Sequence, residues 1–326
     1  MERILVTGSA GHLGEGLMRV LREAGRDAAG LDVLPSPYTD VVGSVADREL
    51  VREALRGATA VVHAATLHKP HVSSHGRQAF LDTNVTGTLT LLEEAVAAGV
   101  DRFVFTSTTS TFGRALVPRP GEPAAWITED VVPVPRNIYG VTKTAAEDLC
   151  ELVHRDTGLP VLVLRTSRFF PEGDDRDDVR AAFQDANLKV NELLYRRVDL
   201  QDAVDAHLCA LERAPSLGFG RYIISATTPF APADLAELRR DAAAVVWRHH
   251  PDAEAEWARR GWRMFAEIER VYVNERARAE LGWAPRYDFG HAVALLTAGE
   301  DWRSPLTRAV GAKGYHAESH GVYTSR

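Results

Sequence analysis

The sequence feature that most constrains the fold is a glycine-rich turn near the start of the chain, Thr7-Gly8-Ser9-Ala10-Gly11-His12-Leu13-Gly14. It follows a short apolar run over residues 4–7 and precedes apolar residues at helical spacing. Three glycines at this spacing allow a tight turn, close approach of the backbone to a pyrophosphate, and close packing of helix on strand. The start of the helix offers N–H groups and a favourable dipole to phosphates. The turn therefore predicts a dinucleotide site formed by Gly8, Gly11, His12, Leu13 and Gly14.

Two carboxylates follow at positions that suit the adenosine half of such a cofactor. Asp32 ends the predicted second strand, where an acid hydrogen-bonds the ribose hydroxyls of NAD and repels the extra phosphate of NADP. Val33 and Leu34 come next, so no arginine is at hand to receive a 2′-phosphate. Asp47 could reach the adenine edge, or it could cap the helix that begins behind it. We therefore expect NAD as the cofactor.

Strand-like and helical patterns alternate through the first half of the chain. We predict strands over residues 3–7, 28–33, 41–45, 58–64, 102–107 and 161–165, and helices over 13–24, 47–55, 78–98 and 138–156. Such alternation predicts an α/β fold, a Rossmann-type doubly wound parallel sheet, because right-handed crossovers place helices on both faces. The second half is less regular, with a helix expected over 200–213, a strand over 221–225, helices over 232–238 and 274–281, and a solvated acidic loop at 174–178.

These patterns also suggest how the chain is divided. We expect a NAD-binding Rossmann domain over residues 1–165, with 191–227 returning to it. Residues 166–302 would form mainly a smaller C-terminal α/β substrate-binding part. Residues 303–326, rich in His, Gly and Ser, would be a tail that packs late or stays mobile.

Composition narrows the class of protein. The formal net charge is −7 and no basic block stands out, so a nucleic-acid partner is not expected. The two cysteines, Cys150 and Cys209, form no disulfide framework, which suits a reducing, cytoplasmic location. The first strand begins almost at once, leaving no room for a signal peptide, and no apolar run approaches the roughly 20 residues of a membrane helix. No metal is expected either, because His68 and His71 lack a Cys or carboxylate partner at ligand spacing.

Tyr139 and Lys143 form a candidate catalytic pair. They are four residues apart and share one face of the helix predicted over 138–156. An unperturbed tyrosine has a pKa of about 10, too high for a base at neutral pH, and a nearby ammonium lowers that pKa. Tyr139 could then take the proton of a substrate hydroxyl while hydride leaves the same carbon. The alternative is that Tyr139 and Lys143 are surface residues that merely happen to be four apart. The glycine turn upstream favours the catalytic interpretation over this alternative.

Taken together, the motifs resemble a known family. Beside the glycine turn and Tyr139-Gly140-Val141-Thr142-Lys143, they include His63-Ala64-Ala65, Asn84-Val85-Thr86-Gly87-Thr88 and the Ser/Thr-rich stretch over 105–113. Weaker matches are Arg165, Arg197-Val198-Asp199 and Leu281-Gly282-Trp283-Ala284-Pro285. Over about residues 1–295 the chain resembles the extended short-chain dehydrogenases/reductases, in their NAD-dependent epimerase/dehydratase group.

The resemblance implies roles for further residues. Thr108 would hold the substrate oxygen as the third catalytic group, with Ser107 and Thr109 as adjacent alternatives. Lys143 would also hydrogen-bond the nicotinamide ribose. Asn84 would hold structure or a water near the active site, or would be a buried residue with all its hydrogen bonds made. The residues implied on the cofactor side are Ala64, Ala65, Asn84, Ser107, Tyr139 and Lys143.

The sequence also departs from the family. Sugar dehydratases carry Asp-Glu after the catalytic threonine, whereas this chain has Thr109 and Ser110, so dehydration is not expected. The segment between Arg165 and Arg197 is shorter than in many nucleotide-sugar epimerases, which argues against a nucleotide-linked substrate. Five residues of this region could bind a diphosphate, or could be ordinary surface residues: Arg168, Asn187, Lys189, Arg196 and Arg263. The candidate substrate residues are Thr109, Arg168, Phe170, Asn187 and Arg263.

Three functions remain open at this point. The first is an epimerase that oxidises and re-reduces a carbinol carbon of a sugar, possibly nucleotide-linked, with NAD bound throughout. The second is a net NAD-dependent dehydrogenase or ketone reductase on a free sugar, sugar acid or other small alcohol. The third is a non-catalytic NAD-binding protein on the same fold. The resemblance also implies a homodimer formed through the helices predicted over 78–98 and 138–156.

Overall fold

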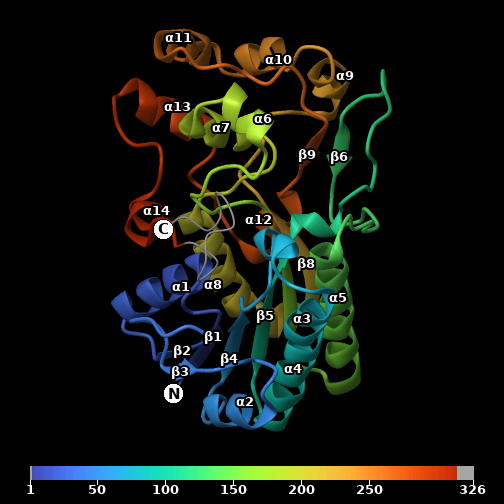
Figure 1. The fold of residues 1–326 in the computed structure, drawn as a ribbon, viewed down its shortest axis with the longest axis vertical. Helices are drawn as coiled ribbons and strands as arrows, with labels where there is room; N and C mark the ends of the chain where they lie inside the picture. Colours follow the sequence, from blue (N-terminus) through green and yellow to red (C-terminus); the bar gives the residue numbers. More distant parts are fainter. Residues whose placement is uncertain (1, 314–326) are drawn as a thin grey trace.

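The computed structural model describes residues 2–313, and its main body is one parallel sheet covered by helices on both faces (Figure 1). Seven strands pair in the order β3-β2-β1-β4-β5-β7-β8, and every pairing is parallel. The strands are β1 (Ile4–Thr7), β2 (Ala28–Asp32), β3 (Val41–Val42), β4 (Ala60–His63), β5 (Arg102–Thr108), β7 (Val161–Thr166) and β8 (Phe219–Ile224). The predicted Rossmann-type fold class is confirmed.

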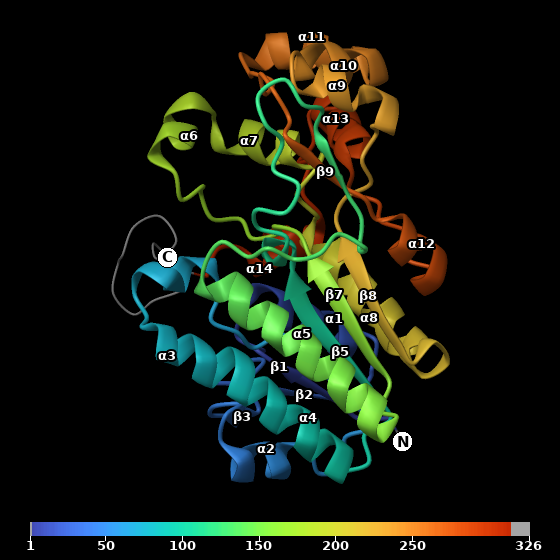
Figure 2. The same cartoon turned by 90° about the vertical axis from the view of Figure 1, so that its right-hand side faces the viewer.

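The helices divide between the two faces of the sheet because each carries one apolar face. One apolar cluster joins the sheet to α1 (His12–Glu23), α8 (Leu200–Leu217), α12 (Glu275–Leu281) and α14 (Pro305–Val310). The other joins it to α2 (Arg48–Ala54), α4 (Gly87–Ala97) and α5 (Ile138–Thr157). Figure 2 shows α4 and α5 side by side on that second face. The predicted helix over 78–98 is interrupted: α3 (Arg77–Phe80), a π-helical turn η2 (Leu81–Thr86) and α4 follow one another.

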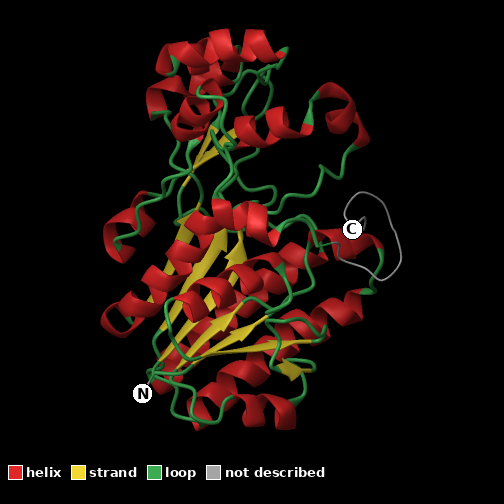
Figure 3. Ribbon diagram, turned by 90° about the vertical axis from the view of Figure 1, so that its left-hand side faces the viewer, coloured by secondary structure: helices red, strands yellow, loops and turns green. Residues whose placement is uncertain are grey.

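A smaller, mostly helical part stands above the carboxyl ends of the strands (Figure 3). It contains a two-stranded sheet of β6 (Ala125–Ile127) and β9 (Arg270–Tyr272). Its helices are α6 (Asp177–Ala182), α7 (Asp185–Glu192), α9 (Leu235–Leu238), α10 (Ala242–His249), α11 (Pro251–Arg260) and α13 (Phe289–Thr297), with the 3-10 turn η4 (Pro232–Asp234) leading into α9. Two further 3-10 turns, η1 (Lys69–Ser73) and η3 (Thr109–Thr111), follow strands β4 and β5. A separate apolar cluster around Trp257 and Phe289 holds this part together.

The predicted solvated acidic segment at residues 174–178 is exposed except at its first residue. Residues 175–178 are exposed, whereas Asp174 is buried and pairs with Arg168 at 2.5 Å, and α6 begins at Asp177. Asp174 turns inward because its ion-pair partner, Arg168, lies six residues earlier in the chain.

The last described segment of the chain packs on the main body. Helix α14 packs against α1 and α8, so the first part of the predicted tail is ordered against the main body. The rest of that tail, residues 314–326, lies outside the described residues. Within residues 2–313, none of the helices has both the length and the apolar character that crossing a bilayer requires.

Candidate active site

A cavity of about 920 Å³ runs along the carboxyl ends of the strands, between the main sheet and the smaller part. In parallel α/β sheets, this edge is where ligands bind. Many of the predicted site residues line this cavity: Gly8, Gly11, His12, Leu13, Gly14, Asp32, Ala64, Ala65, Ser107, Thr108, Thr109, Tyr139, Arg168 and Phe170.

The glycine turn at one end of the cavity requires glycine for steric reasons. Gly8 has a φ of +74°, and a Cβ atom there would lie 2.7 Å from the backbone nitrogen of Ala65. A Cβ atom on Gly14 would lie 1.9 Å from the carbonyl oxygen of Gly8. Helix α1 begins just after Gly11, and no side chain caps its first N–H groups. A backbone cradle closed to side chains, beside an uncapped helix N-terminus, fits the pyrophosphate of a dinucleotide.

Asp32 lies at the carboxyl end of β2, where it lines the same cavity. One carboxylate oxygen accepts from the N–H of Ala10 at 3.0 Å and the other from the N–H of Leu34 at 2.9 Å. These bonds fix the carboxylate beside the turn, in the orientation that a ribose diol can use.

Replacing Asp32 with Asn should weaken the preference for NAD over NADP by about tenfold, since the amide nitrogen cannot accept from Ala10 and the charge that repels a 2′-phosphate is gone. Titration of both cofactors by calorimetry measures this ratio. Asp40→Asn is a matched control, because Asp40 also accepts from a backbone N–H, that of Gly30 at 2.7 Å, but does not line the cavity. An unchanged ratio in Asp32→Asn would remove the assigned role.

Two predicted cofactor residues are placed away from the cavity. Asp47 is the N-cap of α2, where its side chain accepts from the N–H of Leu50 at 3.2 Å. Asn84 is buried in η2 and uses its whole amide group within the protein, on Thr66, Leu67 and Thr142. Neither lines the cavity. The structure supports the structural alternative for both: Asp47 caps α2, and Asn84 fixes the Thr66-Leu67 segment that does line the cavity.

Thr108 and Tyr139 come together at the other end of the cavity. Thr108 is the last residue of β5, and Tyr139 is the second residue of α5, whose N-cap is Asn137. The Tyr139 phenol is buried and hydrogen-bonds to the Thr108 side chain. Burial raises the pKa of Tyr139 to about 12, and the Thr108 hydrogen bond opposes this only in part. The phenol therefore keeps its proton throughout the neutral range in the cofactor-free protein.

Lys143 is placed differently from the prediction. Its ammonium is buried over the ring of Phe105, 3.9 Å from the ring centroid, and the residue does not line the cavity. Burial lowers its pKa to about 7, opposed by the nearby Cys150 and Glu147. Without cofactor, desolvation dominates at both groups, so the pKa of Tyr139 is raised; a lowering of that pKa by Lys143 stays a prediction. Contact of Lys143 with a nicotinamide ribose stays a prediction.

A buried ion pair lies behind these residues and was not predicted. Glu147 accepts from Ser107 at 2.5 Å and is paired with Arg165 at 2.8 Å, with all three side chains buried. Because Glu147 belongs to α5, Ser107 to β5 and Arg165 to β7, the pair fixes the helix that carries Tyr139 to the strand that carries Thr108. Ser107, an alternative to Thr108 in the prediction, is thus used for structure. In the sequence, the feature that could have drawn attention to Glu147 is its position four residues after Lys143, on the same helix.

His63 is a structural residue between β1 and α4. Its Nδ1 is 2.7 Å from the Thr7 hydroxyl and its Nε2 is 2.9 Å from the Thr88 hydroxyl. Thr88 donates to the carbonyl oxygen of Asn84, and Thr7 accepts from the N–H of Ala65. The proton of the neutral ring therefore lies on Nε2. Burial, assisted by the charge of Lys143, lowers the pKa of His63 to about 3, so it does not act as a base at neutral pH.

The predicted substrate residues divide into two groups. Thr109, Arg168 and Phe170 line the cavity, and Arg168 is held by Asp174 and by Glu192 at 3.1 Å. Asn187 instead bonds the backbone N–H and C=O of Arg263 at 3.0 and 2.9 Å, and neither residue reaches the cavity. Sequence reasoning missed several lining residues, which come from connections and from the unpredicted strand β9: Arg136, Phe183, Tyr195, Phe265, Arg270 and Tyr272.

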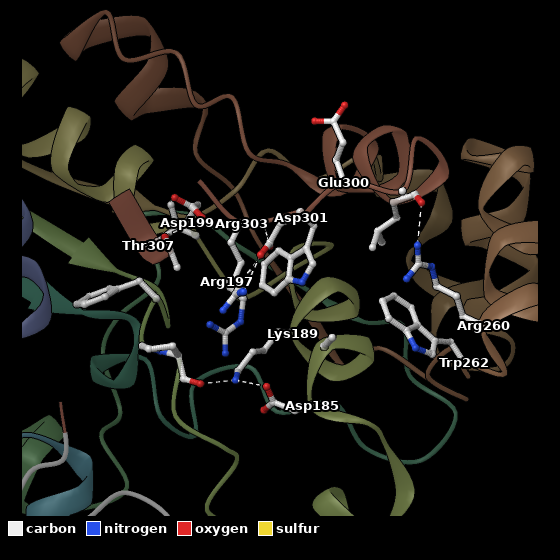
Figure 4. A pocket seen from close by; sticks show the side chains of 17 residues that line it. Asp185, Lys189, Arg197, Asp199, Arg260, Trp262, Glu300, Asp301, Arg303 and Thr307 are labelled. Carbon is white, nitrogen blue, oxygen red and sulfur yellow. Dashed lines mark hydrogen bonds and ion pairs between the residues drawn. The ribbon is translucent and has the colours of Figure 1, made fainter. Parts of the chain in front are cut away.

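A second cavity of about 420 Å³ lies beyond the segment 169–171, and Figure 4 shows the side chains that line it. Two cationic side chains that line this cavity are paired with carboxylates that also line it: Lys189 with Asp185 at 2.5 Å, and Arg303 with Asp301 at 2.6 Å. Lys189 also donates to the carbonyl oxygen of Pro171, so it supports that segment from outside the active cavity. The structure therefore corrects the suggestion that Lys189 binds a substrate diphosphate. Within residues 2–313, no group of His, Cys, Asp and Glu side chains could hold a metal ion.

Comparison with known proteins identifies the family of the chain. A model of the NAD dependent epimerase/dehydratase family matches residues 4–224. A dTDP-glucose 4,6-dehydratase of Streptomyces antibioticus is 31% identical over 335 residues, covering 92% of this chain and 91% of that protein. The low-salt glycan biosynthesis protein Agl12 of Haloferax volcanii is 34% identical over 182 residues, 51% of this chain and 56% of that protein. For three curated relatives that it matches, the chain spans about half of the relative's length or less.

Solved structures show the same fold. A short-chain dehydrogenase/reductase superfamily protein from Agrobacterium tumefaciens with bound NAD superposes with a TM-score of 0.64 at 24% identity. The match covers 91% of this chain and 98% of that one. At this identity the likeness concerns the architecture of the sheet and its helices.

Proposed function

Because this chain belongs to the NAD dependent epimerase/dehydratase family, we propose that it is an epimerase that inverts a carbinol carbon of a sugar. NAD, held by the glycine turn and Asp32, supplies the hydride acceptor and donor when bound. The observation that carries the proposal is the hydrogen-bonded pair of Tyr139 and Thr108 in the cavity that also contains that turn.

The chain's own groups perform the proton transfers. Thr108 holds the carbinol oxygen, and the phenolate form of Tyr139, once its own proton has left to solvent, takes the carbinol proton as the carbon is oxidised. The same phenol returns the proton when the carbonyl carbon is reduced from the other face, after the keto sugar has turned within the cavity. Since burial raises the pKa of Tyr139 to about 12, proton return is the easier step and oxidation should accelerate as the pH rises.

The cavity lining favours epimerisation over dehydration. Loss of water from a sugar needs an acid that protonates the leaving hydroxyl. Among the described residues, the only carboxylates lining the cavity are Asp32, Glu267 and Glu269, and the residues after Thr108 are Thr109 and Ser110. Tyr139 and Thr108 therefore have no carboxylic acid beside them in the chain segment where sugar dehydratases carry one.

Net dehydrogenation is the second candidate, and it uses the same residues. Incubation with NAD and a panel of sugars, sugar acids and nucleotide sugars separates the two functions. The epimerase produces the isomer without accumulation of reduced cofactor, whereas a dehydrogenase accumulates one reduced cofactor for each product molecule. Failure of every sugar class with wild-type protein, under conditions where NAD binds, would contradict both functions and favour a protein that only binds NAD.

We further propose a homodimer formed through η2, α4 and α5. Leu81, Val141 and Leu152 are 40%, 47% and 40% exposed on these elements, so an interface formed there would bury three apolar side chains. Sedimentation velocity at micromolar concentration should show a dimer, and Val141→Glu with Leu152→Glu should convert it to a folded monomer. A wild-type protein that is monomeric at every concentration would refute the interface.

A further inference from the structure

The end of the active cavity beside Tyr139 has a basic lining. We call it the tyrosine end; it comprises Thr108, Thr109, Ser110, Arg136, Asn137 and Tyr139, with His68, Lys69 and His71 from the loop after β4. Of the three lining carboxylates among residues 2–313, Asp32 belongs to the dinucleotide turn, and Glu267 pairs with Arg239 at 2.6 Å. Glu269 lies 4.0 Å from the same arginine. The whole chain has a net charge of −7, so this basic lining is a local property.

Arg136 carries the charge closest in sequence to the catalytic phenol. It directly precedes Asn137, the N-cap of α5, and its backbone is held against the loop after β5. A Cβ atom on Gly113 would lie 2.9 Å from the Arg136 nitrogen, and the N–H of Arg114 donates to Val134 at 2.7 Å. Within residues 2–313, no carboxylate pairs with the Arg136 guanidinium, whereas Arg168 is held by both Asp174 and Glu192.

The loop after β4 adds hydrogen-bond donors to the same end of the cavity. The N–H of His68 donates to Nδ1 of His71 at 3.0 Å, so neutral His71 carries its proton on Nε2. The two rings meet edge to face at 4.7 Å, and their 3-10 turn η1 packs against α5. Lys69 joins this turn to Asp175 at 2.6 Å, which fixes it across the cavity. This loop and Arg136 therefore line the same cavity as Tyr139, and because Lys69 is paired with Asp175, Arg136 is the cation of this end that has no carboxylate partner among residues 2–313.

We infer that the substrate is a sugar acid, whose carboxylate lies close to the reacting carbinol and is bound by Arg136. The inference rests on the proposed function and specifies its substrate class. A planar guanidinium binds a carboxylate through two parallel hydrogen bonds, and such charge-assisted contacts are stronger than those to a neutral hydroxymethyl group. The acidic substrate should be preferred in kcat/KM by roughly 10- to 100-fold.

Matched pairs of compounds test this assignment. Glucose is compared with glucuronate, and galactose with galacturonate. Each pair is tested both as free sugars and as UDP conjugates, so that the nucleotide diphosphate is present in both members of a pair or absent from both. The acidic member should react faster in whichever form the protein accepts. Equal or faster reaction of the neutral member overturns the inference but leaves the proposed function standing. If no compound reacts, the proposed function fails. The preference for an acidic over a neutral sugar can then still be measured, by calorimetric binding of both to the NAD-loaded Tyr139→Phe protein.

Variants locate the recognising group. Arg136→Met should remove the preference for the acid by raising its KM, and Arg136→Lys should restore part of it because the charge is kept. Arg114→Met is the control, since Arg114 is an exposed arginine of the adjoining loop that does not line the cavity. Retention of the full acid preference in Arg136→Met, with circular dichroism and NAD affinity unchanged, would also overturn the assignment.

Discussion

Tyr139→Phe should lower kcat by about 10²- to 10⁴-fold while leaving NAD affinity nearly unchanged, the loss typical of removing a general acid–base group. The variant deletes one hydroxyl from a buried ring, so the packing around it is kept. The Thr108 side chain, which interacts with that hydroxyl, also accepts a hydrogen bond from the N–H of Ser110 at 3.1 Å. It therefore keeps a hydrogen-bond partner in the variant. Steady-state kinetics and calorimetric titration of NAD together measure the two quantities.

Tyr38→Phe provides the control for this prediction. Tyr38 lies outside the cavity, beside Arg19 and Arg22, so loss of its hydroxyl should leave kcat unchanged. A Tyr139→Phe protein with wild-type kcat would show that the phenol transfers no proton, and the proposed chemistry would have to be abandoned.

Lys143→Met should make the protein more stable at neutral pH, although it should also lose activity. The wild-type ammonium is buried, and burial lowers its pKa from 10.5 to about 7. Between these values the unfolded chain binds one proton more than the native protein, so wild-type stability rises with pH by about 1.4 kcal/mol per unit. Below pH 7 both states are charged and the full cost of burying the charge remains. Met fills a similar space without a charge, and so it removes that cost.

Urea unfolding of the cofactor-free proteins at pH 7, 8 and 9 measures this difference. The gap in the free energy of unfolding between Lys143→Met and wild type should be largest at pH 7 and should shrink as the pH rises. A gap that is absent at pH 7, or that grows with pH, would show that the ammonium is not desolvated.

The Rossmann body was predictable because its determinants are local in sequence. Gly8 and Gly14 are required by contacts within one turn and one neighbouring strand, and Asp32 follows from the end of β2. Tyr139 and Thr108 were recognisable from their motifs, and both line the cavity beside each other.

What could not be predicted depends on contacts between distant segments. The position of Lys143 over Phe105 follows from packing of α5 on β5, which the spacing to Tyr139 does not reveal. Asn187 bonds the backbone of Arg263, 76 residues away, and so its amide is unavailable to a substrate. Asp47 was undecided between capping and cofactor contact, and only the geometry of α2 settles that it caps.

The central claim is that a buried phenol beside Thr108 moves the substrate proton in the cavity formed with the glycine turn. The most direct test is a single-turnover measurement of reduced-cofactor formation against pH, using NAD-loaded protein and the sugar that reacts best in the paired comparison. The account predicts that the wild-type rate rises with pH through the neutral range and that Tyr139→Phe loses it at every pH. A rate that is independent of pH and persists in Tyr139→Phe would contradict it.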